Sequence, residues 1–349
     1  MKAVAGTLAR AVVHRPRYER LDARPVSADA EGLALGGLAL AIVRPNGAQE
    51  ELPGMEPSKT RFTFASEGET VVGDLFLPNG GEPVGAVIAV GPLTSVKEQA
   101  PGTYARAMAA RGYAALAFDY RYFGESGGQP RQFENPDANI EDIRNAASAL
   151  LADDRLRNLR IAGLGVCFGA GPMVSAVARD PRFSAFAGVA GVYTDNAKTV
   201  AAMGPAYQAK INRGRAAERR WRETGESQVI PAVGPDGGDV AMPLREAYEF
   251  YGTPRGAVPN YVNGYAVQSL AYSLPFDARR AAGAIEVPVL IVHSDKALAP
   301  DLARAFYADV RSPKSDLWLD SQGQIDFYDD PKLIAPAADA VDAFLRARD

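Results

Sequence analysis

The residues best able to carry out chemistry surround the only cysteine of the chain, Cys167, which lies between Gly165 and Gly169. A run suited to a strand precedes them at 159–164, and small residues suited to a helix follow at 170–179. A nucleophile between two glycines, on a sharp turn from strand to helix, can present its side chain to a carbonyl carbon. The helix N-terminus should then lower the pKa of the thiol. A buried cysteine in a glycine-rich turn is the alternative interpretation.

Attack on a carbonyl also requires hydrogen-bond donors for the oxygen that becomes negative. The amide of Phe168, directly after Cys167, would be the first donor. The loop at 91–95 follows an apolar run, and we expect an amide of Leu93 or Thr94 to be the second. An ordinary connection between a strand and a helix explains this loop equally well.

A proton acceptor is harder to find, because the chain has only two histidines. His14 lies in an irregular N-terminal segment. His293 ends a predicted core strand, so we interpret it as structural, with a relocated catalytic base as the alternative. Beside the turn that carries Cys167, Asp119 and Arg121 are expected to pair with each other or with Glu125.

Short apolar runs alternate with helical patterns through most of the chain, which predicts an α/β fold with a mostly parallel central sheet and helices on both faces. An antiparallel hairpin is predicted at 61–78. Further strands are predicted at 85–90, 113–118, 159–164, 185–192, 287–292 and 316–319, and helices at 104–111, 139–151, 170–179 and 330–345.

This alternation is interrupted at 196–282, which is too long for an ordinary connection. We interpret these residues as a helical cap insertion into a core formed by 58–195 and 283–349. Residues 1–57 show no sustained period and are predicted to be a poorly ordered N-terminal extension that is dispensable for folding. Helices within the insertion are predicted at 210–224 and 244–251.

The composition fits a globular protein that acts on a small molecule. The chain has 349 residues, 47% of them hydrophobic, with a net charge of −4 and no block of Lys or Arg. These features argue against nucleic acid and membrane as partners, so we expect a small-molecule ester or acyl substrate and leave homodimer formation open. A lone cysteine makes no internal disulfide, which favours a cytoplasmic location. No metal or other cofactor is expected.

A series of motifs runs along the chain in a fixed order: GPLTSVKEQ at 91–99, FDYRYFGES at 118–126, PR at 130–131, NIEDI at 139–143, the cysteine turn, RGAVP at 255–259 and IDFYD at 325–329. With these motifs, residues of about 59–346 resemble the dienelactone-hydrolase-related, polyketide-transferase-like branch of the α/β hydrolases. The resemblance implies ester hydrolysis or acyl transfer through Cys167, with a histidine in the loop before Asp326 and an acid after the strand that ends at Val292.

The chain departs from this pattern at two positions. Gln324 stands where the family's histidine would fall, and an amide cannot take a proton. The acid position falls at Ala297, although Asp295 and Asp301 flank it and either carboxylate could serve. Asp326 is a further candidate, either orienting Gln324 or acting through a water molecule.

Three functions are compatible with these residues. A cysteine has some thiolate at neutral pH, so an ester or thioester can acylate Cys167 without a histidine, whereas water attacks the acyl-enzyme poorly without a base. The chain is therefore predicted to be a hydrolase or an acyltransferase that works through a Cys167 acyl-enzyme. The alternative is a catalytically degenerate hydrolase-fold protein that binds a small molecule. A third hypothesis is a proton-transfer or cyclisation catalyst without covalent chemistry.

Overall fold

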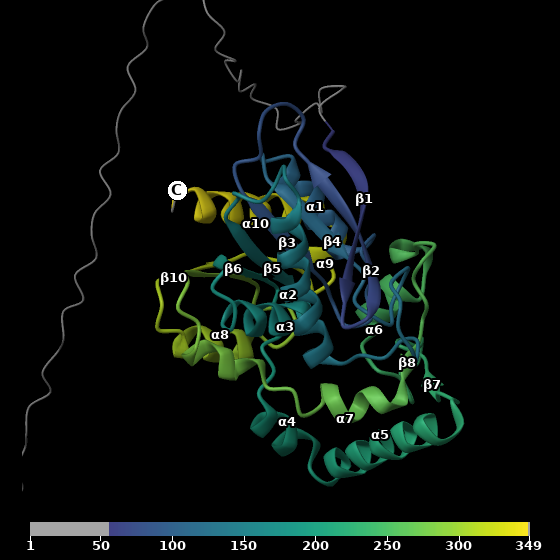
Figure 1. Cartoon of the computed structure of the whole chain (residues 1–349). Coiled ribbons are helices and arrows are strands. Elements are labelled where there is room, and N and C mark those ends of the chain that lie inside the picture. Colours follow the sequence, from purple (N-terminus) through teal and green to yellow (C-terminus); the bar gives the residue numbers. More distant parts are fainter. Residues whose placement is uncertain (1–55, 348–349) are drawn as a thin grey trace, which may run out of the picture. The chain divides into compact units, whose positions relative to one another are not determined.

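The computed structural model of the chain describes residues 56–347 (Figure 1). The extension predicted at 1–57 lies outside the described residues, apart from its last two positions. The description below concerns residues 56–347 only.

Eight strands form one sheet in the order β1-β2-β4-β3-β5-β6-β9-β10. Strands β1, β2 and β4 pair antiparallel, and every other neighbouring pair is parallel. The prediction of a mostly parallel α/β sheet with helices on both faces is confirmed. The strands are β1 (Ser58–Ser66), β2 (Glu69–Leu77), β3 (Ala86–Val90), β4 (Ala114–Phe118), β5 (Ile161–Val166), β6 (Phe183–Val189), β9 (Val289–His293) and β10 (Lys314–Trp318).

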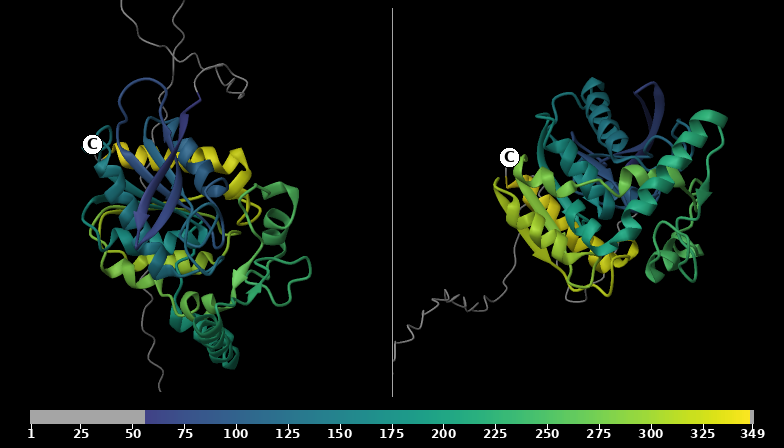
Figure 2. Two further views of the ribbon diagram at one scale, coloured as in Figure 1. Left: turned by 45° about the vertical axis from the view of Figure 1, so that its right-hand side comes forward. Right: turned by 90° about the horizontal axis from the view of Figure 1, so that it is seen from below.

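Helices cover both faces of this sheet, which is why its central strands are continuous apolar runs. In β3, Val87 contributes to one hydrophobic cluster and Ile88 to the other, as the alternation of a strand requires. The first cluster includes side chains of α1 and α10, and the second those of α2, α3 and α8. Figure 2 shows helices on both faces of the sheet. These helices are α1 (Ala100–Ala109), α2 (Pro136–Ala152), α3 (Ala170–Val177), α8 (Pro300–Asp309) and α10 (Pro331–Arg346).

Two of the longer helices begin at residues typical of helix starts. Asn135 caps α2 by accepting hydrogen bonds from the amides of Asp137 and Ala138, with proline at the next position. Asp330 caps α10 in the same way, again before a proline. These local signals fix the ends of the helices that flank the candidate site.

The chain between β6 and β9 leaves the sheet and returns to the loops at the carboxyl ends of the strands. Gln99, in the loop after β3, donates a hydrogen bond of 2.8 Å to the carbonyl of Gly256. The hydroxyl of Ser269 accepts one of 2.9 Å from the amide of Glu134, after β4. The elements of this segment are α4 (Asn196–Met203), α5 (Pro205–Thr224), β7 (Val229–Ile230), α6 (Arg245–Tyr251), β8 (Tyr265–Ala266) and α7 (Leu270–Ser273) (Figure 1).

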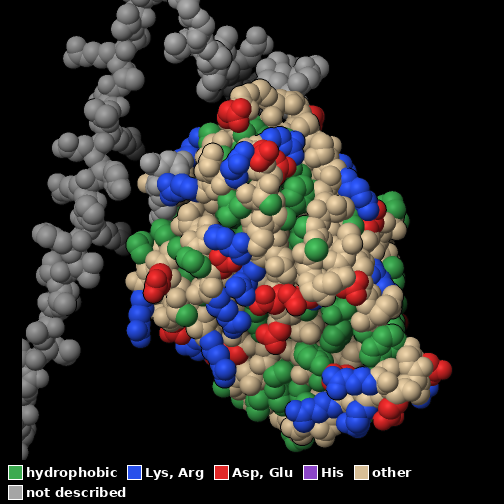
Figure 3. All heavy atoms as spheres, viewed as in Figure 1, with side chains coloured by type: hydrophobic (Ala, Val, Ile, Leu, Met, Phe, Trp, Pro, Cys, Tyr) green, Lys and Arg blue, Asp and Glu red, His purple; other side chains and the backbone are tan. Residues whose placement is uncertain are grey.

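The surface carries charges of both signs. On the face shown in Figure 3, Lys and Arg side chains alternate with Asp and Glu side chains and with apolar ones. Of the helices within residues 56–347, none has both the length and the apolar character that crossing a bilayer demands.

Candidate active site

The cysteine turn has the backbone geometry of a sharp strand-to-helix turn. Cys167 begins the 3-10 turn Cys167–Gly169 between β5 and α3, and its φ of 55° is unusual for a residue with a side chain. A Cβ atom at Gly165 would collide with the backbone of Ala170, and one at Gly169 with the backbone of Gly91. The two glycines therefore allow the close approach that the turn needs.

Three donor groups near the sulfur of Cys167 act to lower the pKa of its thiol: the hydroxyl of Tyr328, the amide of Phe168 and the side-chain amide of Gln324. The side chain of Cys167 is nevertheless buried, and burial raises the pKa of the thiol above its usual range against the effect of these donors. The charge of Glu246 raises this pKa further. The amide of Phe168 at the helix start lowers the pKa as expected, but desolvation has the larger effect, so the pKa of the thiol is raised overall.

Gln324 is buried and held at both ends of its side chain. Its Oε1 accepts a hydrogen bond of 2.8 Å from the amide of Leu298, and its Nε2 donates to the carbonyl of Ala190 at 2.9 Å and to the hydroxyl of Tyr328 at 3.2 Å. The structure thus brings Gln324 to Cys167, as the resemblance implies for the family's histidine. A backbone amide occupies the place expected for an acid.

The structure does not bring the two flanking carboxylates to the sulfur. Asp295 is exposed and pairs with Arg304 at 2.6 Å. Asp301 is an exposed residue in the first turn of α8, where a negative charge favours the helix dipole. Neither is among the groups that act on the Cys167 thiol.

Asp326 shapes the turn that leads into Gln324. Its Oδ2 accepts hydrogen bonds from the amides of Gln322 at 2.6 Å and Gly323 at 3.3 Å. The carboxylate therefore fixes the backbone before Gln324 and has no hydrogen bond to the Gln324 side chain.

His293 is buried at the end of β9. Its Nδ1 lies 2.9 Å from the carbonyl of Ser294 and its Nε2 lies 3.3 Å from the carbonyl of Gly191, while its ring packs against Trp318. Burial lowers the pKa of the imidazole. Both ring nitrogens face backbone carbonyls and not Cys167, which is the arrangement of a structural histidine.

The two candidate amides of the loop after β3, at 91–99 and called the oxyanion loop below, differ in their hydrogen bonding. The amide of Thr94 donates a hydrogen bond of 3.3 Å to the carboxyl group of Glu134. The amide of Leu93 makes no hydrogen bond to any part of the chain that the structure describes. Together with the amide of Phe168, which faces the sulfur, Leu93 is therefore the better candidate donor.

The sequence did not reveal Glu134 as a site residue, because it lies in a loop with no motif of its own. Its carboxyl group also accepts a hydrogen bond of 2.6 Å from Asn139. Burial raises the pKa of Glu134 to about 7. The group supports the oxyanion loop through Thr94.

A buried ion network lies behind the same loop. The ammonium of Lys97 contacts Asp119 at 3.1 Å and Glu125 at 2.5 Å, and Asp119 also accepts the Lys97 amide at 2.7 Å. Arg121 pairs instead with Asp142 at 2.7 Å. The predicted pairing of Asp119 and Arg121 with each other or with Glu125 is wrong, because Lys97 is buried beside Asp119 and Glu125 and takes the place of the expected arginine.

Tyr251, in α6, is a further site residue that the sequence did not reveal. Its hydroxyl is buried and has no hydrogen-bond partner among residues 56–347. Burial raises the pKa of this phenol, and the neighbouring Cys167 adds to the effect. An unpaired buried hydroxyl beside the sulfur is available to a bound ligand.

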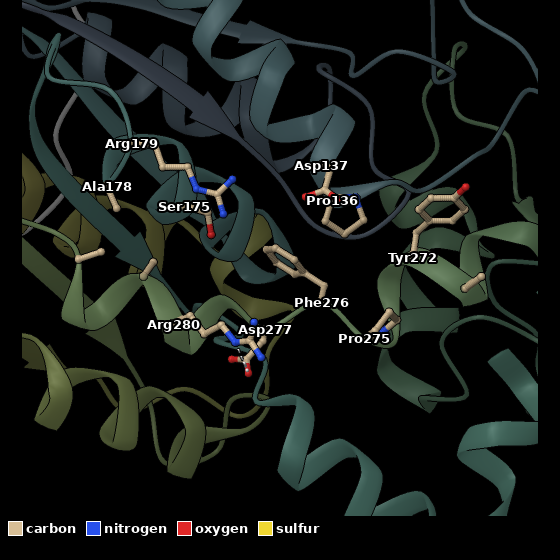
Figure 4. A pocket seen from close by; sticks show the side chains of 13 residues that line it. Pro136, Asp137, Ser175, Ala178, Arg179, Tyr272, Pro275, Phe276, Asp277 and Arg280 are labelled. Carbon is tan, nitrogen blue, oxygen red and sulfur yellow. Dashed lines mark ion pairs between the residues drawn. The ribbon is translucent and has the colours of Figure 1, made fainter.

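A cavity of about 360 Å³ opens on the other side of α3 (Figure 4). Cys167 does not line it. Phe276, which does, packs against Phe168 with ring centroids 6.2 Å apart. The lining residues are Pro136, Asp137, Ser175, Ala178, Arg179, Ala271, Tyr272, Pro275, Phe276, Asp277, Arg280, Ala281 and Ala284.

Within the described range 56–347, no three His, Cys, Asp or Glu side chains are grouped so that they could hold a metal ion.

Comparison with known proteins establishes the family. PA2218 of Pseudomonas aeruginosa, an uncharacterized protein, is 33% identical over 285 residues, which cover 77% of this chain and 76% of PA2218. Its crystal structure superposes with a TM-score of 0.72 at 27% identity, over 84% of this chain and 94% of that one. The α/β hydrolase GrgF from Penicillium superposes with a TM-score of 0.67 at 22% identity, over 83% and 96% of the two chains, and shows the same fold.

The chain belongs to the PA2218 family of α/β-hydrolase-fold proteins. The quorum-quenching protein AidA of Acinetobacter baumannii is 29% identical to this chain over 230 residues, which cover 64% of this chain and 74% of AidA. No model of a protein family matches the chain. Its narrower placement in the dienelactone-hydrolase-related branch stays a prediction.

Proposed function

We propose that this α/β-hydrolase-fold protein is an enzyme that takes the acyl group of an ester or thioester onto Cys167 and passes it to an acceptor. The acceptor is water in a hydrolase and another nucleophile in an acyltransferase. The substrate is a small molecule bound between the oxyanion loop and the segment 196–282, which acts as a cap.

The observation that carries this proposal is the arrangement at the turn. Cys167 has a φ of 55°, the amide of Phe168 faces its sulfur, and the amide of Leu93 is unpaired in the loop after β3. A backbone donor directly after the nucleophile and a second one in the loop after an earlier strand are what a tetrahedral acyl intermediate requires.

In the first half-reaction the thiolate of Cys167 attacks the acyl carbon, and the carbonyl oxygen becomes an oxyanion that the two amides stabilise. Collapse of this intermediate breaks the bond to the leaving group and forms the acyl thioester. The leaving group departs with the proton that the thiol released to solvent. The chain's own donors thus assist the nucleophile and the intermediate.

The raised pKa of the thiol limits which acyl donors can react with Cys167. Little thiolate forms at neutral pH, and Gln324 can only donate to it. Activated acyl groups, such as thioesters and aryl esters, are therefore better substrates than simple alkyl esters. A cysteine remains able to react here where a serine without a base would be nearly inert.

A catalytically degenerate protein that binds a small molecule is the second candidate. The observation that favours it is that Gln324, whose amide cannot take a proton, stands where the family's histidine would fall and has both ends of its side chain hydrogen-bonded within the chain. In that case the unpaired hydroxyl of Tyr251 would serve binding alone.

Intact-protein mass spectrometry after exposure to p-nitrophenyl acetate and to acetyl thioesters separates the two candidates. An acetyl adduct on Cys167 that is absent from Cys167→Ala supports the acyl-enzyme. If the thiol stays unmodified at all concentrations of the acyl donor, and if a ligand stabilises both the wild type and Cys167→Ala, the result supports binding without turnover. Because AidA is described as a quorum-quenching protein, quorum-sensing signal molecules belong among the compounds tested.

A further inference from the structure

A carboxylate from the insertion lies beside the residue that stands in the histidine's place. Glu246, in the first turn of α6, accepts a hydrogen bond of 3.0 Å from the backbone amide of Gln324 through its Oε2. The same carboxylate lies so close to Gly323 that a Cβ atom there would collide with it. Glu246 and Cys167 thus both contact Gln324, one at its backbone and the other at its side chain.

The second oxygen of this carboxylate is available. Oε1 of Glu246 makes no hydrogen bond and no ion pair within the part of the chain that the structure describes. The neighbouring cation on α6, Arg245, pairs with Glu249 at 2.8 Å. Glu246 is half-buried, so its free oxygen can meet a water molecule or an acceptor that enters beside the sulfur.

The other carboxyl groups near the site are committed elsewhere. Asp295 pairs with Arg304, Asp326 accepts two amides of its own turn, and Glu134 holds the amide of Thr94. Glu246, in contrast, accepts a hydrogen bond from the backbone of Gln324, and its charge raises the pKa of the Cys167 thiol. It combines closeness to the sulfur with an unpaired oxygen.

We propose that Glu246 is the general base of the second half-reaction, which deprotonates the acceptor as it attacks the acyl group on Cys167. This inference rests on the proposed acyl-enzyme. It places the missing base on the insertion and not in the core, on an element whose sequence carries no catalytic motif.

The acceptor, which is water, an alcohol, an amine or a thiol, forms a bond to the acyl carbon and gives its proton to Oε1 of Glu246. The oxyanion is held by the amides of Leu93 and Phe168. Collapse breaks the carbon–sulfur bond, the sulfur of Cys167 leaves as thiolate, and the proton returns from Glu246 to the sulfur through solvent. The products are the acylated acceptor and the free thiol.

Glu246→Gln is the informative change, because the amide oxygen can still accept the hydrogen bond from the Gln324 backbone while basicity is lost. Glu249→Gln, on the same helix but outside the site, is the matched control. We expect the acylation burst to be kept in both variants and deacylation to slow by about 10²-fold or more only in Glu246→Gln. Rapid-quench mass spectrometry should then show accumulated acyl-Cys167.

Glu246→Gly adds a second readout that a structural role would not produce. Formate or acetate in solution can enter the vacated space and accept the proton, so deacylation should recover in proportion to the concentration of the added acid. Deacylation at the wild-type rate in Glu246→Gln, or an equal loss in both half-reactions without rescue, overturns the role of Glu246. Failure of the wild-type protein to form any adduct on Cys167 overturns the acyl-enzyme itself, which separates the two proposals.

Discussion

The backbone amide of Leu298 donates a hydrogen bond of 2.8 Å to Oε1 of Gln324. A side chain at position 324 therefore meets a donor on the side where a catalytic histidine would need an acceptor. A neutral imidazole placed there would accept this hydrogen bond through Nδ1 and carry its proton on Nε2, facing the carbonyl of Ala190. That tautomer cannot take a proton from Cys167.

From this geometry we expect Gln324→His alone to change the hydrolysis of an activated ester by no more than about twofold. The double change with Ala297→Asp should raise it by about tenfold or more, because a carboxylate can hold the Nδ1 proton and free Nε2 to act as the base. Stopped-flow measurement of acylation and deacylation checks this. A tenfold gain from the single change would show that the loop carrying Leu298 rearranges.

Tyr328 provides a test of the sulfur's surroundings. Its hydroxyl lowers the pKa of the Cys167 thiol and thereby favours the thiolate, against the burial that raises this pKa. Tyr328→Phe should raise this pKa further and slow alkylation by iodoacetamide at pH 8 by about two- to tenfold, the worth of one hydrogen bond. Tyr248→Phe, on α6, is the control. Equal alkylation rates in all three proteins would contradict the contact.

Glu134 should make stability depend on pH. Burial raises its pKa from 4.5 to about 7, so the folded protein favours the protonated carboxyl group. Its contribution to stability is therefore fully present below about pH 4.5 and is lost as the pH rises to about 7. Asp142, whose pKa burial raises to about 6, titrates in the same range.

Glu134→Gln isolates the first of these two groups. The amide can accept from Thr94 through its oxygen and donate to Oδ1 of Asn139, which lacks a partner, once the Asn139 side chain turns over. Relative to the wild type, the variant should gain up to about 3 kcal/mol of unfolding free energy between pH 4.5 and 7.5. Urea unfolding across this range measures the difference, in which the titration of Asp142 cancels. Parallel curves for the two proteins would refute it.

The central strands of the sheet could be predicted from the sequence because they are continuous buried, mostly apolar runs. The run predicted at 85–90 became β3 (Ala86–Val90), and the run at 287–292 became β9 (Val289–His293). Helix α8 was not predicted. Asp301 was interpreted only as a candidate acid, although it lies in the first turn of this helix. Local pattern was sufficient where burial is continuous along the chain.

The site was predictable only where a motif carried it. The resemblance placed Gln324 opposite Cys167, and the structure brings the two together. Tyr251 and Glu246 reach the site because α6 returns to it after a long excursion, and no local pattern encodes that path. The pKa of the thiol went in the unexpected direction for the same reason, since burial depends on contacts between distant segments.

The buried ion network makes the last prediction. Lys97 is 1% exposed and lies 3.1 Å from Asp119, which is fully buried. Lys97→Met would leave the Asp119 carboxylate in the interior without a cation, at a cost of about 3–5 kcal/mol of unfolding free energy. The amides of Lys97 and Glu125, which also donate to Asp119, place the expected cost at the lower end of this range.

Lys59→Met is the matched control, because Lys59 pairs with Asp74 at a similar distance of 3.3 Å but is half exposed, so its loss should cost at most about 1 kcal/mol. Adding Asp119→Asn to Lys97→Met should recover part of the loss by removing the unpaired charge. Urea unfolding at pH 7 measures all four proteins. If Lys97→Met costs no more than Lys59→Met, then the ammonium does not stabilise the oxyanion loop, and the amide hydrogen bonds to Asp119 are sufficient to hold it.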